Sequence, residues 1–219
     1  MQPQIAFLFD MDGVIIDSTE THTDAWIAYL RSHGLNIPDA GKRMLGKHND
    51  EIVRDFFGQQ GLTDEMISDH GSRKEQIYRE MIAPNLLKKL VPGVPEFLSR
   101  HSDIPSAMGT NAEPANIEFV LDRSGLKRFF SALVSGFEVK RPKPFPDVYL
   151  RAAEMLGAAP ECCIVFEDSH TGVAAARAAG MRVVGLLTTL STFGNVDLEI
   201  RDFCDPNLER WLTSQMACA

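Results

Sequence analysis

The sequence contains short apolar runs separated by longer segments with helical periodicity. The runs cover Ile5–Phe9, Ile104–Met108, Ala132–Val134, Ile164–Phe166 and Arg182–Leu187. They lack the polar alternation of a strand that exposes one face to water, so we expect strands buried on both faces of a parallel sheet. Right-handed crossovers would place the intervening helices on those two faces. The pattern predicts an α/β fold with a Rossmann-like, doubly wound parallel sheet.

The segment 18–90 interrupts this alternation because it holds helical patterns and no convincing strand. One helical stripe is formed by Trp26, Tyr29, Leu30 and His33. The turn residues Pro92 and Gly93 mark the return to the sheet. A chain of 219 residues suits one main domain with a smaller insertion. We therefore predict a core domain of residues 1–17 and 91–219 and an inserted helical cap domain of residues 18–90.

The composition excludes several classes of protein. The net charge is -8 and the basic residues are scattered, so we expect no nucleic-acid partner. The four cysteines show no CxxC spacing, which indicates reduced thiols. The apolar run at the N-terminus is too short for a secretory or membrane-spanning segment. We expect a cytoplasmic protein without a membrane partner, either a monomer or a weak homodimer.

Two aspartates, Asp10 and Asp12, follow the first apolar run at once. Open α/β sheets bind their ligands at the carboxyl ends of the strands. Two desolvated carboxylates there would repel each other unless a cation or a proton separated them. With a metal ion to neutralise charge, Asp10 could attack a phosphate and form an aspartyl-phosphate, while Asp12 served as general acid and base. The alternative is a solvated turn.

A second acidic pair, Glu167 and Asp168, follows the run Ile164–Phe166. Mg²⁺ prefers a few carboxylates together with water and substrate oxygens, so Asp168 and Asp10 together would form a site for this ion. The alternative is that Asp168 or Ser169 caps the alanine-rich helix that follows.

Two further segments carry groups that suit an anion. Thr110 and Asn111 follow a strand and precede a helix, where hydroxyl, amide and backbone N–H groups can bind phosphate; an N-cap role for Thr110 is the alternative. Lys143 stands between Pro142 and Pro144 in a stiff loop, from which it could pair with phosphate and Asp10. An exposed surface lysine is the alternative for Lys143.

Taken in order, these segments resemble the motifs of the haloacid dehalogenase superfamily. The matching stretches are DMDGVIIDS at 10–18, the strand-end Thr110, KPFPD at 143–147, and VFEDS at 165–169 with Gly172-Val173. The resemblance implies Asp10 as nucleophile, Asp12 as acid and base, and Thr110 and Lys143 on the phosphate. It also implies Mg²⁺ on Asp10, the backbone carbonyl of Asp12 and Asp168, supplemented by Glu167. Asp12 argues against dehalogenation, because true dehalogenases lack this second aspartate.

Within the superfamily, the chain is most similar to the branch of β-phosphoglucomutases and sugar phosphatases. His22 and Lys74 match the positions of a cap histidine and a cap lysine of the mutase, although His22 could instead pack on Trp26. The segment 45–50 departs from the mutase because it lacks an arginine for a second phosphate. Lys47 or His48 could compensate, but a lysine offers only a point charge. We place Gly46 and Lys47 in this segment among the substrate contacts, together with Asn111, His22 and Lys74.

These features predict a Mg²⁺-dependent phosphatase that hydrolyses a small phosphate ester, with a sugar phosphate expected as substrate. The alternative activity is that of a β-phosphoglucomutase, which interconverts β-glucose 1-phosphate and glucose 6-phosphate. A third hypothesis is a binding or regulatory protein that keeps the fold without activity, against which the full set of motif residues speaks.

Overall fold

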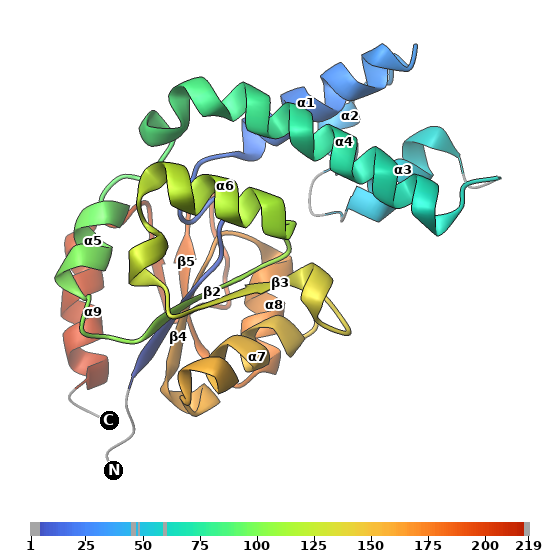
Figure 1. Cartoon of the computed structure of the whole chain (residues 1–219). Helices are drawn as coiled ribbons and strands as arrows, with labels where there is room; N and C mark the ends of the chain where they lie inside the picture. Colours follow the sequence, from blue (N-terminus) through green and yellow to red (C-terminus); the bar gives the residue numbers. More distant parts are fainter. Residues whose placement is uncertain (1–4, 45–46, 48, 59–60, 217–219) are drawn as a thin grey trace. The chain divides into compact units, whose positions relative to one another are not determined.

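The computed structural model describes residues 5–44, 47, 49–58 and 61–216 (Figure 1). The chain divides into two compact units, one of Met1–Asp17 with Leu86–Ala219 and the other of Ser18–Asn85. The second unit ends at Asn85, before the turn residues Pro92 and Gly93 that suggested a boundary at residue 90. The 3-10 helix η1 (Ala83–Lys88) follows the last helix of the insertion directly and spans this boundary.

The first unit is built on a parallel sheet with the strand order β3-β2-β1-β4-β5-β6 in its described residues. The strands are β1 (Ala6–Phe9), β2 (Ser106–Thr110), β3 (Ala132–Ser135), β4 (Cys163–Glu167), β5 (Arg182–Leu186) and β6 (Leu198–Ile200). The predicted doubly wound α/β fold is therefore confirmed. The short β6 was not predicted, because three residues with a central glutamate carry no strand signal.

The end of β2 differs from the prediction in a way that matters for the site. The apolar run suggested Ile104–Met108, whereas the strand runs from Ser106 to Thr110. Pro105 has no N–H to donate to a ladder, although its carbonyl accepts a hydrogen bond from Phe7. The strand continues to Thr110, which pairs with Ser135 of β3.

The two faces of the sheet are covered by different helices. Phe7 and Phe9 point to one face, where Phe7 stacks on Phe97 of α5 (Val94–Arg100) with ring centroids 5.8 Å apart. An ion pair between Arg100 and Glu209 joins α5 to α9 (Pro206–Met216), and these helices lie side by side in Figure 1. Aromatic packing therefore fills this side of the core.

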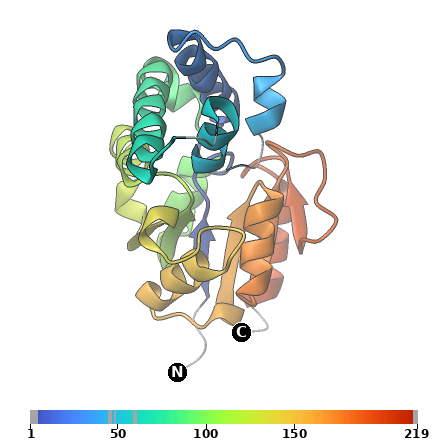
Figure 2. The ribbon, with the colours of Figure 1, turned by 90° about the vertical axis from the view of Figure 1, so that its right-hand side faces the viewer.

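The opposite face is packed with smaller side chains. Ala6 and Leu8 of β1 belong to a buried cluster with residues of α7 (Asp147–Leu156) and α8 (His170–Ala178). Both helices cover this face and contact each other (Figures 1 and 2). The unit also contains α6 (Pro114–Ser124) and the 3-10 helices η2 (Lys127–Phe129), η3 (Gly136–Glu138) and η4 (Pro160–Cys162).

The second unit, Ser18–Asn85, contains helices and no strand among its described residues. The helices are α1 (Thr19–Ser32), α2 (Ala40–Met44), α3 (Asn49–Phe57) and α4 (Asp64–Ile82). The stripe of α1 supplies the buried Trp26, Tyr29 and Leu30 to a core shared with α3. Thr63 caps α4 by accepting a hydrogen bond from the Met66 N–H.

Across the part of the chain that the structure describes, every helix is too short or too polar to cross a membrane. Cys162, Cys163 and Cys204 are free thiols, and Cys218 lies outside the described residues.

Candidate active site

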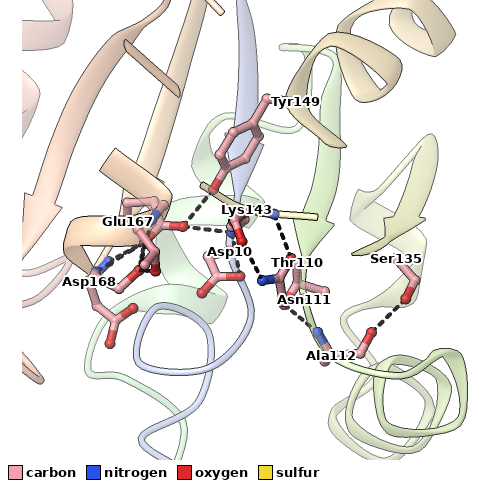
Figure 3. Close-up of polar contacts among 12 residues, drawn as sticks. Asp10, Thr110, Asn111, Ala112, Ser135, Lys143, Tyr149, Glu167 and Asp168 are labelled. Atoms are coloured by element: carbon pink, nitrogen blue, oxygen red, sulfur yellow. Dashed lines mark hydrogen bonds and ion pairs between the residues drawn. The ribbon is translucent and has the colours of Figure 1, made fainter. Parts of the chain in front are cut away.

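Parallel pairing brings the predicted catalytic residues to one edge of the sheet. Phe9 of β1 is in register with Phe166 of β4, so Asp10 and Glu167 follow side by side. Thr110 ends the strand on the other side of β1. Figure 3 shows these side chains around Lys143, which comes from the loop before α7. This edge, at the carboxyl ends of the strands, is where doubly wound sheets bind ligands.

Lys143 is buried and lies between two carboxylates. Its Nζ donates hydrogen bonds to Oδ1 of Asp10 at 2.9 Å and to Oε1 of Glu167 at 2.6 Å. Burial alone would lower the pKa of Lys143, but the charges of Asp10 and Glu167 outweigh it and raise the pKa above its usual value. The alternative of an exposed surface lysine is therefore wrong, and Lys143 is a fixed ammonium at the site.

Asp10 is almost fully removed from water. Burial raises its pKa to about 6, with help from the charge of Glu167 and, less, of Asp12, while Lys143 opposes the shift. The alternative of a solvated turn is therefore wrong for Asp10. A cation beside its carboxylate would favour the ionised form that a nucleophile needs.

Asp12 lies in a tight loop that follows Asp10. Gly13 has φ of 76°, and its N–H donates to the carbonyl of Ile16 at 2.7 Å. A Cβ on Gly13 would lie 1.9 Å from Oδ2 of Asp168, so only glycine leaves room for this carboxylate. The loop thus places Asp12, which is partly exposed, two residues beyond the candidate nucleophile.

Glu167 is fully buried, and both of its oxygens accept hydrogen bonds. Oε1 accepts from Lys143 and from the hydroxyl of Tyr149, the latter at 2.8 Å. Oε2 accepts from the N–H groups of Asp168 and Ser169 and from the hydroxyl of Ser169. A Cβ on Gly172 would lie 1.6 Å from Oε1, so the first turn of α8 closes directly over the carboxylate.

Asp168 is buried beside the other two acids. Burial, followed by the charges of Glu167 and Asp10, raises the pKa of Asp168 well above its usual value. The hydroxyl of Thr189 donates to its Oδ2. The capping alternative applies to Ser169, whose hydroxyl accepts from the N–H of Gly172 at the start of α8.

The three acids fit a hard metal ion. Carboxylate oxygens of Asp10, Glu167 and Asp168 lie within 4.8 Å of one another, and all three residues are buried. Buried carboxylates at this separation repel each other, and oxygen ligands are those that Mg²⁺ prefers.

The segment after β2 faces the lysine loop. The hydroxyl of Thr110 accepts a hydrogen bond from the N–H of Ala112, and the N-cap of α6 is Glu113, so the alternative of Thr110 as the N-cap is wrong. The amide of Asn111 binds the backbone of Lys143 twice, with Oδ1 accepting from its N–H and Nδ2 donating to its carbonyl. Asn111 therefore holds the loop that carries the ammonium.

In the helical unit, the structure brings His22 and Lys74 together. Lys74 Nζ lies 2.9 Å from Nδ1 of His22 and 2.7 Å from Oε1 of Glu75, and Lys74 and Glu75 are both buried. His22 stacks on Tyr78 with ring centroids 3.7 Å apart, whereas the ring of Trp26 faces the ammonium of Lys74.

The two remaining candidates lie between α2 and α3. Gly46 is outside the described residues. The ammonium of Lys47 is exposed and pairs with Oδ2 of Asp55 at 3.1 Å, while Arg43 occupies the other oxygen of Asp55.

Sequence reasoning did not single out Tyr149 or Glu75. Tyr149 lies in the first turn of the helix after the lysine loop. At that position, its sequence context could not be distinguished from that of an ordinary core residue. Burial and the charge of Glu167 raise the pKa of the Tyr149 hydroxyl well above its usual value, so it stays protonated as a donor. The sequence leaves two possibilities for Thr188 and Thr189 after the last predicted strand, a loop near the site or a solvated polar segment. The hydrogen bond from Thr189 to Asp168 supports the loop near the site.

The sheet is doubly wound, and buried carboxylates and a lysine lie at the carboxyl ends of its strands. These features place the chain in the class of α/β proteins that bind ligands at strand ends. The chain belongs to the haloacid dehalogenase-like hydrolases, whose family model matches residues 6–180. This confirms the family that the motifs resembled.

Several proteins are similar over most of the chain. The Escherichia coli "Fructose-1-phosphate phosphatase YqaB" is 35% identical over 81% of this chain and 93% of its own. The Bacillus subtilis "Beta-phosphoglucomutase" is 30% identical over 93% of this chain and 92% of its own. A crystal structure of "HAD hydrolase, family IA, variant 3" from Entamoeba histolytica matches with a TM-score of 0.84 and 25% identity over 97% of this chain and 100% of its own.

Proposed function

We propose that this chain is a Mg²⁺-dependent phosphatase that hydrolyses a small phosphorylated metabolite, a sugar phosphate, through an aspartyl-phosphate on Asp10. Its family and its relatives support an enzyme that acts on phosphate esters. The observation that carries the proposal is the position of Asp10, whose buried carboxylate lies against the ammonium of Lys143 and close to Asp168. Such a carboxylate can act as a nucleophile only where nearby positive charge offsets that of the phosphate.

The reaction proceeds in two displacements at phosphorus. An oxygen of Asp10 attacks the phosphorus, the bond to the ester oxygen breaks, and Asp12 donates a proton to the departing alcohol. Asp12 then accepts a proton from water as that water attacks the phosphorus of the aspartyl-phosphate. The second step releases phosphate and restores the carboxylate of Asp10.

Asp10 and Asp168 would hold Mg²⁺, with the backbone carbonyl of Asp12 as the family resemblance implies. The bound ion would supply positive charge to the transferring phosphoryl group. Glu167 belongs to the same group of acids, but both of its oxygens already accept hydrogen bonds. We therefore propose that Glu167 supports the metal site through its negative charge and does not ligate the ion with a free oxygen.

The remaining residues bind the substrate. Lys143 and Thr110 contact the phosphate, and Asn111 keeps the lysine loop in place. His22 and Lys74 of the cap contact the part of the substrate beyond the phosphate.

The mutase activity remains the second candidate because of the Bacillus subtilis relative and the paired His22 and Lys74. In a mutase the aspartyl-phosphate passes to a sugar hydroxyl while the cap excludes water. The contact of Lys47 favours hydrolysis instead. Its ammonium, a substitute for the missing arginine, is already paired with Asp55.

The experiment is phosphate release from a panel of sugar phosphates with and without Mg²⁺, with NMR detection of any isomer formed from β-glucose 1-phosphate. We expect metal-dependent phosphate release that Asp10→Asn reduces by at least about a thousandfold, because no covalent intermediate can form. Asp103→Asn, an exposed carboxylate, is the matched control and keeps full activity. Full activity of Asp10→Asn would refute the proposed nucleophile, and glucose 6-phosphate without phosphate release would establish the mutase.

A further inference from the structure

Tyr149 contacts both members of the buried pair formed by Lys143 and Glu167. Its hydroxyl donates to Oε1 of Glu167 at 2.8 Å, and the Nζ of Lys143 lies 4.6 Å from the centroid of its ring (Figure 3). The side chain is fully buried. One tyrosine thus supports the ammonium with its ring and the carboxylate with its hydroxyl.

The backbone of β2 makes room for this ring. A Cβ on Gly109 would lie 3.0 Å from Cδ1 and 3.1 Å from Cε1 of Tyr149. The ring therefore packs against the glycine backbone and can reach Glu167 from α7. Its position is set by the core of the sheet.

The carboxylates of Asp10 and Glu167 compete for the ammonium of Lys143, and the hydroxyl of Tyr149 affects this competition. Lys143 donates to Asp10 at 2.9 Å and to Glu167 at 2.6 Å, and the shorter contact is to Glu167. A second donor on Oε1 shares the negative charge of that oxygen and so weakens its attraction for the ammonium. Without the hydroxyl, Glu167 would draw Lys143 away from Asp10.

We infer that Tyr149 is a positioning residue for phosphoryl transfer, which holds Lys143 against Asp10 through its ring and through its hydrogen bond to Glu167. The inference rests on the proposed function, in which Lys143 and Asp10 meet the phosphoryl group. Loss of the hydroxyl leaves the substrate contacts in place and misplaces positive charge in the transition state, which lowers kcat more than it changes KM.

The test is Tyr149→Phe, which keeps the ring and removes only the hydroxyl. With p-nitrophenyl phosphate and saturating Mg²⁺, we expect kcat to fall about tenfold or more, because the lost bond is to a charged group, and KM to change by less than about twofold. Tyr29→Phe is the matched control, because it removes another tyrosine hydroxyl, one bonded to His70 in the helical unit, and leaves kcat unchanged.

A double-variant comparison separates positioning from general damage. In a Lys143→Ala background, Tyr149→Phe should have no further effect on kcat, because there is no ammonium left to place. A kcat of Tyr149→Phe within about twofold of the wild type would overturn the inference, as would an equal loss in both backgrounds.

An NMR measurement keeps the inference separate from the proposed function. The ¹⁵Nζ signal of Lys143, assigned by its loss in Lys143→Arg, should shift in Tyr149→Phe and stay in place in Tyr29→Phe. An unchanged signal would overturn the inference even if the wild type were active. A wild type without any phosphate release would refute the proposed function, while a shifted signal would still show that Tyr149 places Lys143.

Discussion

The Nζ of Lys143 lies 2.9 Å from Oδ1 of Asp10, although the two residues are 133 positions apart in the chain. The same nitrogen binds Glu167, so a single ammonium separates two buried carboxylates. Removing it would leave both acids in a desolvated site without a counter-charge.

We therefore expect Lys143→Met to lower the free energy of unfolding by about 3–5 kcal/mol at pH 7.5, the usual cost of breaking a buried ion pair. Urea unfolding in EDTA measures this loss. The exposed Lys140→Met is the control and should change stability by less than about 0.5 kcal/mol. Equal stability of the two variants would contradict a structural role for the pair.

Gly172 is expected to tolerate no side chain. A Cβ there would lie 1.6 Å from Oε1 of Glu167, so Gly172→Ala must displace the carboxylate that holds Lys143. Gly71→Ala in α4 is the matched helical control, because its Cβ would meet nothing nearer than 3.7 Å. We expect Gly172→Ala to lose phosphatase activity and about 2 kcal/mol or more of stability, and Gly71→Ala to gain up to about 1 kcal/mol. Thermal unfolding and phosphate release measure both, and an active Gly172→Ala would show that α8 can move away.

Mg²⁺ should stabilise the protein more at pH 8 than at pH 5. The pKa of Asp10 is raised to about 6 by burial, so a proton competes with the ion for this carboxylate below that pH. A thermal-shift titration with MgCl₂ at the two pH values measures the difference. Asp168→Asn should abolish the shift at pH 8, whereas the exposed Asp103→Asn keeps it. A shift of equal size at both pH values would count against Asp10 as a ligand.

Glu75 should make the stability of the helical unit depend on acid pH. Burial alone would raise its pKa, but Lys74, then His22 and Asn49, outweigh burial and lower the pKa to about 2 from 4.5. Because the folded pKa lies below the unfolded one, the carboxylate stabilises the fold above pH 4.5, and this contribution is lost as pH falls towards 2.

Glu75→Gln should therefore lower the free energy of unfolding by about 3 kcal/mol at pH 7, and the gap to the wild type should shrink as pH falls from 4.5 to 3. Hydrogen exchange of the backbone amides in the helical unit, followed as a function of urea concentration, measures this difference in free energy. The exposed Glu80→Gln on the same helix serves as control. A gap that stays constant with pH would exclude the charge of Glu75 as its cause.

The sequence by itself determined the class of fold and the chemical groups of the site. Apolar runs without polar alternation predict buried parallel strands, and in such sheets the residues that follow neighbouring strands meet at one edge. Asp10, Thr110 and Asp168 could therefore be placed from local pattern alone. Lys143 could be placed because prolines on both sides restrict its loop.

Only the tertiary structure decided how these groups are arranged. The partners of Lys143 depend on register across β1 and β4, which no local pattern encodes. The sequence predicted Asn111 as a substrate contact, whereas in the structure its side-chain amide holds the lysine loop. The hydroxyl of Tyr149 reaches Glu167 only because Gly109 of a distant strand leaves room for the ring. Hydrogen-bond partners and pKa shifts arise from burial among residues far apart in sequence, and burial is a property of the packed chain.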